Sequence, residues 1–385
     1  IRDQPRSRGL GDVYKRQGWY GENATDVRTG YVNGIPTSGN DNSEGGMGKG
    51  GSQMMAYPTL FFDYDKDDQR RDVSVCNYGI VLSAKGNKYQ MNTYNGMGVG
   101  KYRINWKKEM GATNSKRNIN FPLLRYADVL LMYAEALNEV NNGPTQEAIN
   151  AVKEVRKRAF RGNEAKAAAG IPTNHDDFLT FIQKERKLEL SNEGLRRTDL
   201  TRWGKQYEML MAEKQRLVNL AKRDGEFANV PVYRAYYLST TPKFEDPTIA
   251  LSYIDLSQAD VEALGLSADQ IKTLKILNSS SKGSLKDVKL YEKDGKLYSA
   301  VNKPEGAVEH SYTILNMFSI VSIKQKGNLC VEDVTGVSSN NAWITGNSGV
   351  FYGLQKNMTE LMPFNTSKIL DVNAGLEGQQ HPAYK

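Results

Sequence analysis

The feature that most constrains the fold is a pair of apolar stripes at helical spacing, separated by a few residues. Apolar residues recur every three or four positions in the first stripe, as on one helix face: Leu123, Ala127, Leu130, Ala134 and Leu137. Pro122 opens this segment and Asn142-Gly143-Pro144 closes it. Thr145 can cap a second helix with the stripe Ile149, Val152, Val155 and Ala159. The short connection predicts an antiparallel hairpin of tetratricopeptide (TPR) size, which needs neighbours to bury its face.

Two more helices and a mixed region follow this hairpin. The third helix is predicted to start near Phe178, with Asp176 or Asp177 as its cap, and the fourth to lie between Gly204 and Arg223. Beyond them the sequence predicts a short helix at Ser257–Gly265 and strands that include a hairpin turning at Asp294-Gly295. The expected fold is mostly α: a TPR-like helical-hairpin scaffold with long loops and a small mixed α/β insertion.

The chain is expected to divide into five segments. Residues 18–111, rich in Gly, Asn and Tyr, are expected to be a loop-rich ligand face, and 112–224 the TPR-like helical core. Residues 225–360 are expected to form the mixed insertion, and 361–385 an extended tail. Residues 1–17 show no helical or strand periodicity, and Pro5–Gln17 resembles a translated sequencing adapter, so 1–17 is expected to be non-native.

Composition excludes several classes of function. The 385 residues carry a net charge of +7, and residues 149–223 hold 17 basic and 10 acidic side chains. Aromatic residues are not interleaved with these charges, so solvated helix faces and ion pairs are favoured over a nucleic-acid groove. Two cysteines, Cys76 and Cys330, permit one bridge at most, and the three histidines lie far apart, which argues against a Cys- or His-based metal site.

Three blocks of sequence occur in the order NINFPLLRYADVLLMYAEALNEV (118–140), AINAVKEVRKRA (148–159) and FIQKERKLELSNEGLRRTDLTRWGK (181–205). In order and spacing they closely resemble the C-terminal half of the SusD/RagB family. The segments FDYDKDDQRRD (62–72) and LMPFNTSKILDVNAGLEGQQHPAY (361–384) are also similar to that family. The family's N-terminal half, with its lipid-attachment cysteine, has no counterpart here, so the resemblance implies a fragment.

The resemblance implies a surface-exposed lipoprotein of the outer membrane that captures glycans. It would be a binding protein without a cofactor and would deliver oligosaccharide to a SusC-like TonB-dependent transporter. It would touch the membrane only through a lipid anchor absent from this chain, and nucleic acid would not be a partner. Three alternatives stay open: peptide capture of the RagB kind, glycoside hydrolysis, and a TPR-type scaffold for protein partners.

Glu185 and Glu189 are the candidate catalytic pair of the hydrolase alternative. Four residues apart, they share one helix face, and paired carboxylates are what glycoside hydrolysis requires. The many arginines nearby would lower their pKa values, which is the wrong direction for a general acid. We therefore expect no catalytic residue and a structural charge network made of Glu185, Arg186, Glu189, Arg196, Asp199 and Arg202.

Other motifs give weaker signals. Asp63, Asp65 and Asp67 alternate as in a calcium loop, but Asp68 and Ser74 stand where an EF-hand needs Gly and Glu, so only a looser calcium site stays open. Residues 46–51 match G-x-G-x-x-G without a preceding strand, and we expect a loop there.

Aromatic residues in the polar loops are the feature of the sequence that indicates glycan binding. An exposed ring can stack on the apolar face of a sugar while Asn or Asp binds its hydroxyls. The glycan-binding candidates are Trp19, Tyr20, Tyr31, Tyr57, Tyr89 and Tyr94. Trp106 and Trp203 lie beside the helical core and are expected to be structural.

Overall fold

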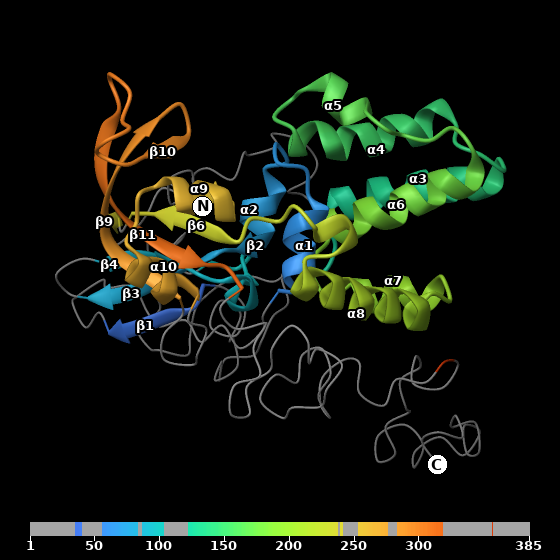
Figure 1. Ribbon diagram of the computed structural model, residues 1–385. Helices are drawn as coiled ribbons and strands as arrows, with labels where there is room; N and C mark the ends of the chain where they lie inside the picture. The colour runs from blue at the N-terminus through green and yellow to red at the C-terminus, as the bar shows by residue number, and fades with distance from the viewer. Residues whose placement is uncertain are drawn as a thin grey trace, which may run out of the picture. The chain divides into compact units, whose positions relative to one another are not determined.

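The computed structural model describes residues 35–40, 56–83, 87–103, 122–237, 239–241, 253–275, 283–318 and 356 (Figure 1). The chain forms two compact units: a first unit of Ile1–Gly194 with Pro231–Ile320, and a second unit of Leu195–Val230 with Val321–Lys385. This division differs from the expected boundaries, because the expected core at 112–224 is split after Gly194. Within the described ranges, no helix has both the length and the apolar character needed to cross a membrane.

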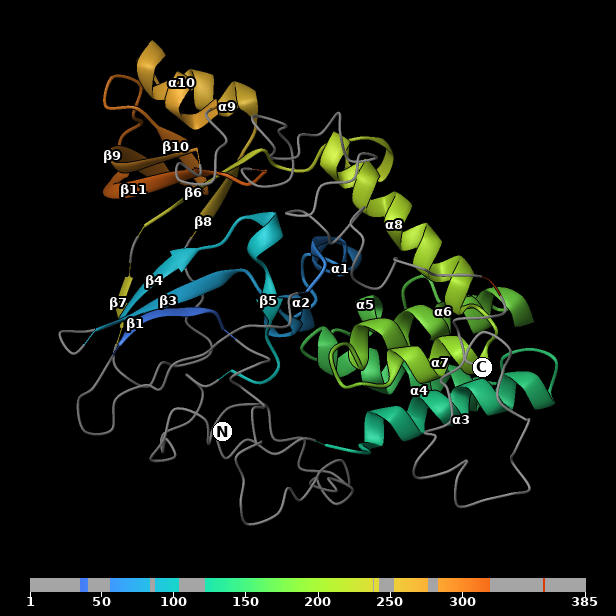
Figure 2. The same cartoon turned by 90° about the horizontal axis from the view of Figure 1, so that it is seen from below.

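The helices of the first unit form the expected hairpin and add a third long helix beside it. They are α3 (Tyr126–Val140), α4 (Gln146–Ala159), α5 (Glu164–Ala168) and α6 (His175–Glu189). Helix α3 packs against both α4 and α6, and Figure 2 shows the three long helices side by side. Their shared core is Ala127, Leu131, Ala134, Ala148, Ala151, Val152, Val155, Phe178 and Ile182. The mostly α scaffold predicted from the apolar spacing is therefore confirmed.

The ends of these helices agree only in part with the boundaries and caps predicted from the sequence. The Thr145 hydroxyl accepts a hydrogen bond from the Ala148 amide at 3.2 Å, as predicted. Helix α3 begins at Tyr126 and not at Pro122, because Arg125 is extended and its guanidinium is engaged by carboxylates distant in sequence. The predicted cap of α6 was also wrong, since Asn174, and not an aspartate, accepts from the Asp177 amide at 3.0 Å.

The expectation of loops for residues 18–111 is wrong where this region is described. It contains β1 (Thr37–Asn40), α1 (Pro58–Asp63), α2 (Arg70–Ser74), β2 (Val75–Cys76), β3 (Tyr78–Ser83), β4 (Asn87–Met91), a 3₁₀ turn at Tyr94–Gly96 and β5 (Gly98–Val99). One sheet has the order β1-β3-β4-β7, in which β7 is Ser239–Thr241, and β2 pairs with β5. These strands are short, and apart from the neighbouring β3 and β4 they pair with segments distant in the sequence, so no local alternation of apolar residues indicates them.

A second, antiparallel sheet forms the mixed part of the first unit, with the order β10-β9-β11-β6-β8. Its elements are β6 (Tyr233–Tyr236), β8 (Tyr253–Leu256), α9 (Gln258–Ala263), α10 (Ala268–Lys275), β9 (Ser284–Lys293), β10 (Lys296–Tyr298) and β11 (Val308–Asn316). The predicted hairpin is confirmed: Lys293 pairs with Lys296, and Asp294 and Gly295 take the positive φ values, 50° and 73°, of a tight turn.

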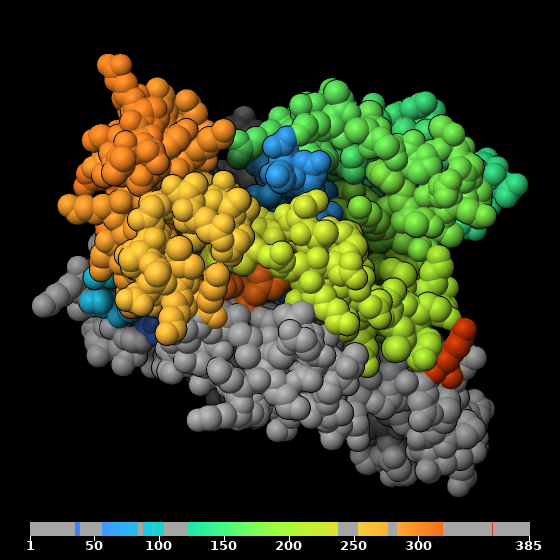
Figure 3. Space-filling view, viewed as in Figure 1, coloured from blue at the N-terminus to red at the C-terminus, as the bar shows by residue number. Residues whose placement is uncertain are grey.

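One face of this sheet packs with the two short helices, which form the gold surface beside the orange strands in Figure 3. Side chains at alternate strand positions share a face. The core there is Tyr233, Ala235, Leu256, Val261, Leu264, Leu274, Leu290, Tyr312 and Ile314. Ser257 caps α9 in a reciprocal capping box with Asp260, which confirms the short helix predicted at this place.

The described part of the second unit is helical. It contains α7 (Arg196–Arg202), α8 (Gln206–Lys222) and a 3₁₀ turn at Gly225–Phe227. Helix α8 confirms the predicted fourth helix and ends at Arg223, whose φ of 55° is left-handed. Helix α7 was not predicted.

Candidate functional site

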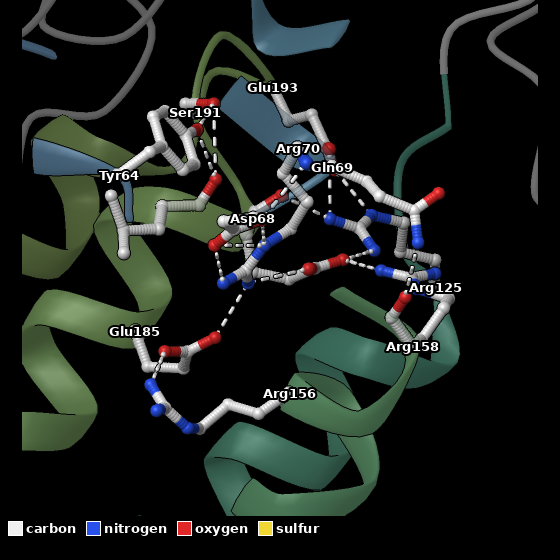
Figure 4. Close-up of polar contacts among 12 residues, drawn as sticks. Tyr64, Asp68, Gln69, Arg70, Arg125, Arg156, Arg158, Glu185, Ser191 and Glu193 are labelled. Carbon is white, nitrogen blue, oxygen red and sulfur yellow. Dashed lines mark hydrogen bonds and ion pairs between the residues drawn. The ribbon is translucent and has the colours of Figure 1, made fainter. Parts of the chain in front are cut away.

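A buried charge network joins α2, α3, α4 and α6 in the first unit (Figure 4). Glu189 is its centre: one carboxylate oxygen pairs with both Arg125 and Arg158, and the other accepts from Arg70 Nη1 at 3.0 Å. The same Arg70 nitrogen donates to Glu185 Oε1 at 2.6 Å. Only 2 % of each glutamate side chain is exposed. The network therefore ties the strand-bearing segment to the helices through two buried carboxylates, although one of their partners, Arg158, keeps 43 % of its side chain exposed.

This geometry bears directly on the hydrolase alternative. Burial raises the pKa of Glu189, but the guanidinium groups of Arg125, Arg158 and Arg70 outweigh it and lower the pKa well below its usual range. Glu185 is held by Arg70 and by Arg156 Nη1 at 3.3 Å. A general acid needs a raised pKa and access to substrate. Glu189 has neither, and the buried Glu185 lacks access to substrate.

The remaining expected network residues fall into two separate sets. In the first unit, Arg186 Nη1 donates to Asp128 Oδ1 at 2.7 Å, and both side chains are buried. The other expected members belong to the second unit, where Arg202 Nε donates to Asp199 Oδ1 at 3.0 Å. The guanidinium groups of Arg196 and Arg202 lie 5.9 Å and 4.5 Å from the centre of the Trp203 ring.

The calcium candidates are engaged by lysines. Lys187 Nζ lies 2.6 Å from Asp63 Oδ2, while Lys166 pairs with Asp67 and lies 4.0 Å from Asp65 Oδ1. Asp63 and Asp67 are thus paired with two different lysines. The described residues contain no group of three or more His, Cys, Asp or Glu side chains arranged for a metal ion.

Of the glycan-binding candidates, Trp19, Tyr20 and Tyr31 lie outside the described residues. Tyr57 precedes α1 and is half-buried. Tyr89 and Tyr94 are only 1 % and 0 % exposed, so neither ring offers a face to a sugar.

The burial of both rings has a clear tertiary cause. The Tyr89 ring lies 5.3 Å from that of Tyr78, its neighbour across the β3–β4 pair. The Tyr94 ring packs 5.3 Å from Phe62 and 5.1 Å from Phe318, and its hydroxyl donates to the Pro231 carbonyl at 3.0 Å.

Most of the remaining motifs named from the sequence lie outside the described residues. Cys76 is buried, with its Sγ 3.1 Å from the Tyr78 carbonyl oxygen, whereas Cys330 lies outside the described residues. The glycine-rich segment 46–51, Trp106 and the tail 361–385 also lie outside them.

A cavity of about 430 Å³ opens on the five-stranded sheet, on the face that carries α9 and α10. This size lies within the range of about 300–1,000 Å³ that is usual for small-ligand sites. The Tyr237 and His310 rings stack with their centres 5.0 Å apart and their planes at 11°. Tyr312 stands edge-on to both rings, at 5.8 Å and 6.0 Å. The cavity thus has an aromatic wall. It was not predicted from the sequence, because Tyr237 is more than 70 residues away from His310 and Tyr312 in the chain.

Charged groups surround this wall. Glu292 Oε2 accepts a hydrogen bond from the Tyr312 hydroxyl at 2.6 Å, and Asp294 lines the cavity from the β9–β10 turn. Lys293 also lines the cavity, with its ammonium donating to the Glu305 carbonyl at 2.8 Å. Burial first, and then Glu292, raises the pKa of Tyr312 well above its usual range. Its hydroxyl therefore remains a proton donor at physiological pH.

Comparison with known proteins gives a consistent result. A model of the SusD family matches residues 13–263. SusD-like protein P2 of Formosa agariphila is 31 % identical over 162 residues, which cover 40 % of this chain and 32 % of that protein. SusD-like protein P25 of the same organism is 43 % identical over 82 residues, or 21 % of this chain and 15 % of that protein. A crystal structure of a SusD homolog from Bacteroides thetaiotaomicron shares 31 % identity, covers 49 % of this chain and 40 % of its own, and superposes with a TM-score of 0.44.

The match to this chain therefore spans about a third or less of the length of these curated relatives. The family model covers more than half of the chain and includes the three blocks on which the resemblance rests. On this ground, the chain belongs to the SusD family.

Proposed function

We propose that this protein captures oligosaccharides without cleaving them, at the outer-membrane surface, and delivers them to a SusC-like TonB-dependent transporter. Membership in the SusD family is the observation that carries this proposal. The surface location, the lipid anchor and the transporter partner follow from the family resemblance and belong to the proposal.

The described residues support binding over catalysis. Glu185 and Glu189, the carboxylate pair that hydrolysis would use, are buried and neutralised by arginines. The cavity on the five-stranded sheet combines aromatic rings with carboxylates, which is the chemistry that holds a sugar by stacking and hydroxyl hydrogen bonds.

The test is electrophoresis of the whole chain in native gels that contain a panel of polysaccharides, with reducing ends assayed in the same mixtures. Glycan capture predicts retardation in at least one gel without new reducing ends. New reducing ends that disappear in Glu185→Gln would instead establish a hydrolase. Absence of retardation from a folded sample, together with retention of peptides on the immobilised protein, would favour peptide capture.

The candidates Trp19 and Tyr20 can be tested in the same gels. As adjacent rings flanked by Gly18 and Gly21, they are proposed to stack on ligand. A variant carrying both Trp19→Ala and Tyr20→Ala should then be less retarded than the unchanged chain.

The proposed partner needs a separate measurement. Co-purification of the lipidated, full-length protein with a SusC-like transporter from outer membranes is the expected result. Recovery of the protein in the soluble fraction, without a transporter, would contradict the localisation.

A further inference from the structure

We infer that the cavity walled by Tyr237, His310 and Tyr312 is an oligosaccharide subsite that accepts uncharged sugars and excludes anionic ones. This inference rests on the proposed function and adds a place and a ligand class to it. It concerns a surface in the mixed part of the first unit, and its aromatic residues are not among the candidates named from the sequence.

The aromatic wall supplies the apolar contact. Tyr237 and His310 are each half-buried, so each ring keeps part of its surface accessible in the cavity. Their parallel stacking and the edge-on Tyr312 fix the rings before any ligand arrives. A preorganised platform loses little conformational entropy when a sugar ring stacks on it.

The polar groups supply acceptors for sugar hydroxyls. Glu292 is held by the Tyr312 hydroxyl through one carboxylate oxygen, which fixes its orientation and leaves its other lone pairs for donors. Asp294, exposed in the turn, has no hydrogen bond or ion pair within the described ranges and can accept from a second hydroxyl. Hydroxyl donors on a neutral sugar match these acceptors.

The charge of the cavity argues against acidic sugars. Two carboxylates, Glu292 and Asp294, line it, and Lys293 is the basic side chain among the lining groups apart from His310. The Lys293 ammonium already donates to the Glu305 carbonyl. A uronate or sulfate brought into this space would face like charge without a free cation to offset it, and such repulsion is an effective means of specificity.

The experiment measures binding to the whole chain by calorimetry. The neutral probe is a hexasaccharide of the uncharged glycan that retards the protein in the gels, and hexagalacturonate is the anionic probe. We expect binding of the neutral probe only. Tyr237→Ala and His310→Ala should each weaken it about fivefold to tenfold, as loss of one aromatic contact implies. Tyr237→Phe keeps the ring and should bind like the unchanged protein.

Tyr291→Ala is the matched control. Tyr291 lies on the same strand, β9, but its neighbours Leu290 and Glu292 point to the cavity face, so Tyr291 lies on the opposite one. Its hydroxyl contacts Glu309 outside the cavity. This variant should retain full affinity.

Removing the two carboxylate charges of the cavity tests whether they exclude anionic sugars. The double variant Glu292→Gln with Asp294→Asn should gain measurable affinity for hexagalacturonate. Unchanged affinity for the neutral probe in both Tyr237→Ala and His310→Ala, with circular dichroism confirming their fold, would overturn the subsite while leaving glycan capture intact. Retardation by acidic polysaccharides alone would overturn the neutral specificity in the same way. Failure to bind any glycan would refute the proposed function itself.

Discussion

The charge of Glu189 is predicted to be essential for the stability of the first unit. Glu189→Gln keeps the size of the side chain and one acceptor oxygen but removes the negative charge that Arg70, Arg125 and Arg158 share. The Arg70 side chain is only 10 % exposed, so water cannot replace the lost charge. Removing one partner of a buried ion pair costs about 3–5 kcal/mol.

Urea denaturation followed by circular dichroism measures this loss. With a slope of about 3 kcal/mol per molar urea, the midpoint should fall by about 1–1.7 M. Glu164→Gln is the control, because Glu164 pairs with Lys157 on the exposed surface. The control should unfold close to the unchanged protein. A midpoint for Glu189→Gln equal to that of the control would refute the reasoning.

The same network predicts a pH dependence. The pKa of Glu189 is lowered in the folded state, so its contribution to stability is complete above the unfolded pKa of about 4.3 and is lost as the pH falls further, toward the folded pKa. The difference in midpoint between the unchanged protein and Glu189→Gln should therefore be constant from pH 7 to about 5 and shrink below pH 4. A difference that grows in acid would contradict the assigned direction.

Three further substitutions test the packing. In Gly100→Ala the new Cβ would lie 2.2 Å from the Val73 carbonyl oxygen, so thermal unfolding should show a loss of about 1–3 kcal/mol, and an unchanged melting temperature would disprove the close approach. Thr145→Ala removes the cap of α4 and should cost about 1 kcal/mol in urea denaturation, whereas Thr145→Ser should restore it. Leu131→Ala, at a fully buried position, should cost about 2–5 kcal/mol, while Leu123→Ala, 56 % exposed, should be nearly neutral; equal losses would refute the assignment of the core.

Local sequence determined the parts of this protein whose interactions are local. The apolar stripes of α3 and α4, the Thr145 cap and the Asp294-Gly295 turn each depend on residues only a few positions apart. Helix periodicity and turn chemistry are encoded in such short segments, so both helices and the turn were predicted correctly. One member of the first stripe was wrong: Leu123 lies before α3 and is 56 % exposed, whereas Leu131 is fully buried in the core.

Only the tertiary structure decided which side chains meet. The sequence indicated that Glu185 and Glu189 would be ion-paired, but Arg70, which binds both, lies more than a hundred residues away. Tyr89 and Tyr94 stand in a polar sequence of the kind expected for an exposed sugar-binding loop. In the structure both are buried, Tyr89 beside Tyr78 in the β3–β4 pair and Tyr94 against Phe318. Tyr237 and His310 meet because β6 and β11 are neighbours in the sheet. Pairing between strands distant in the sequence depends on the packing of the whole fold, so no short sequence segment predicts it.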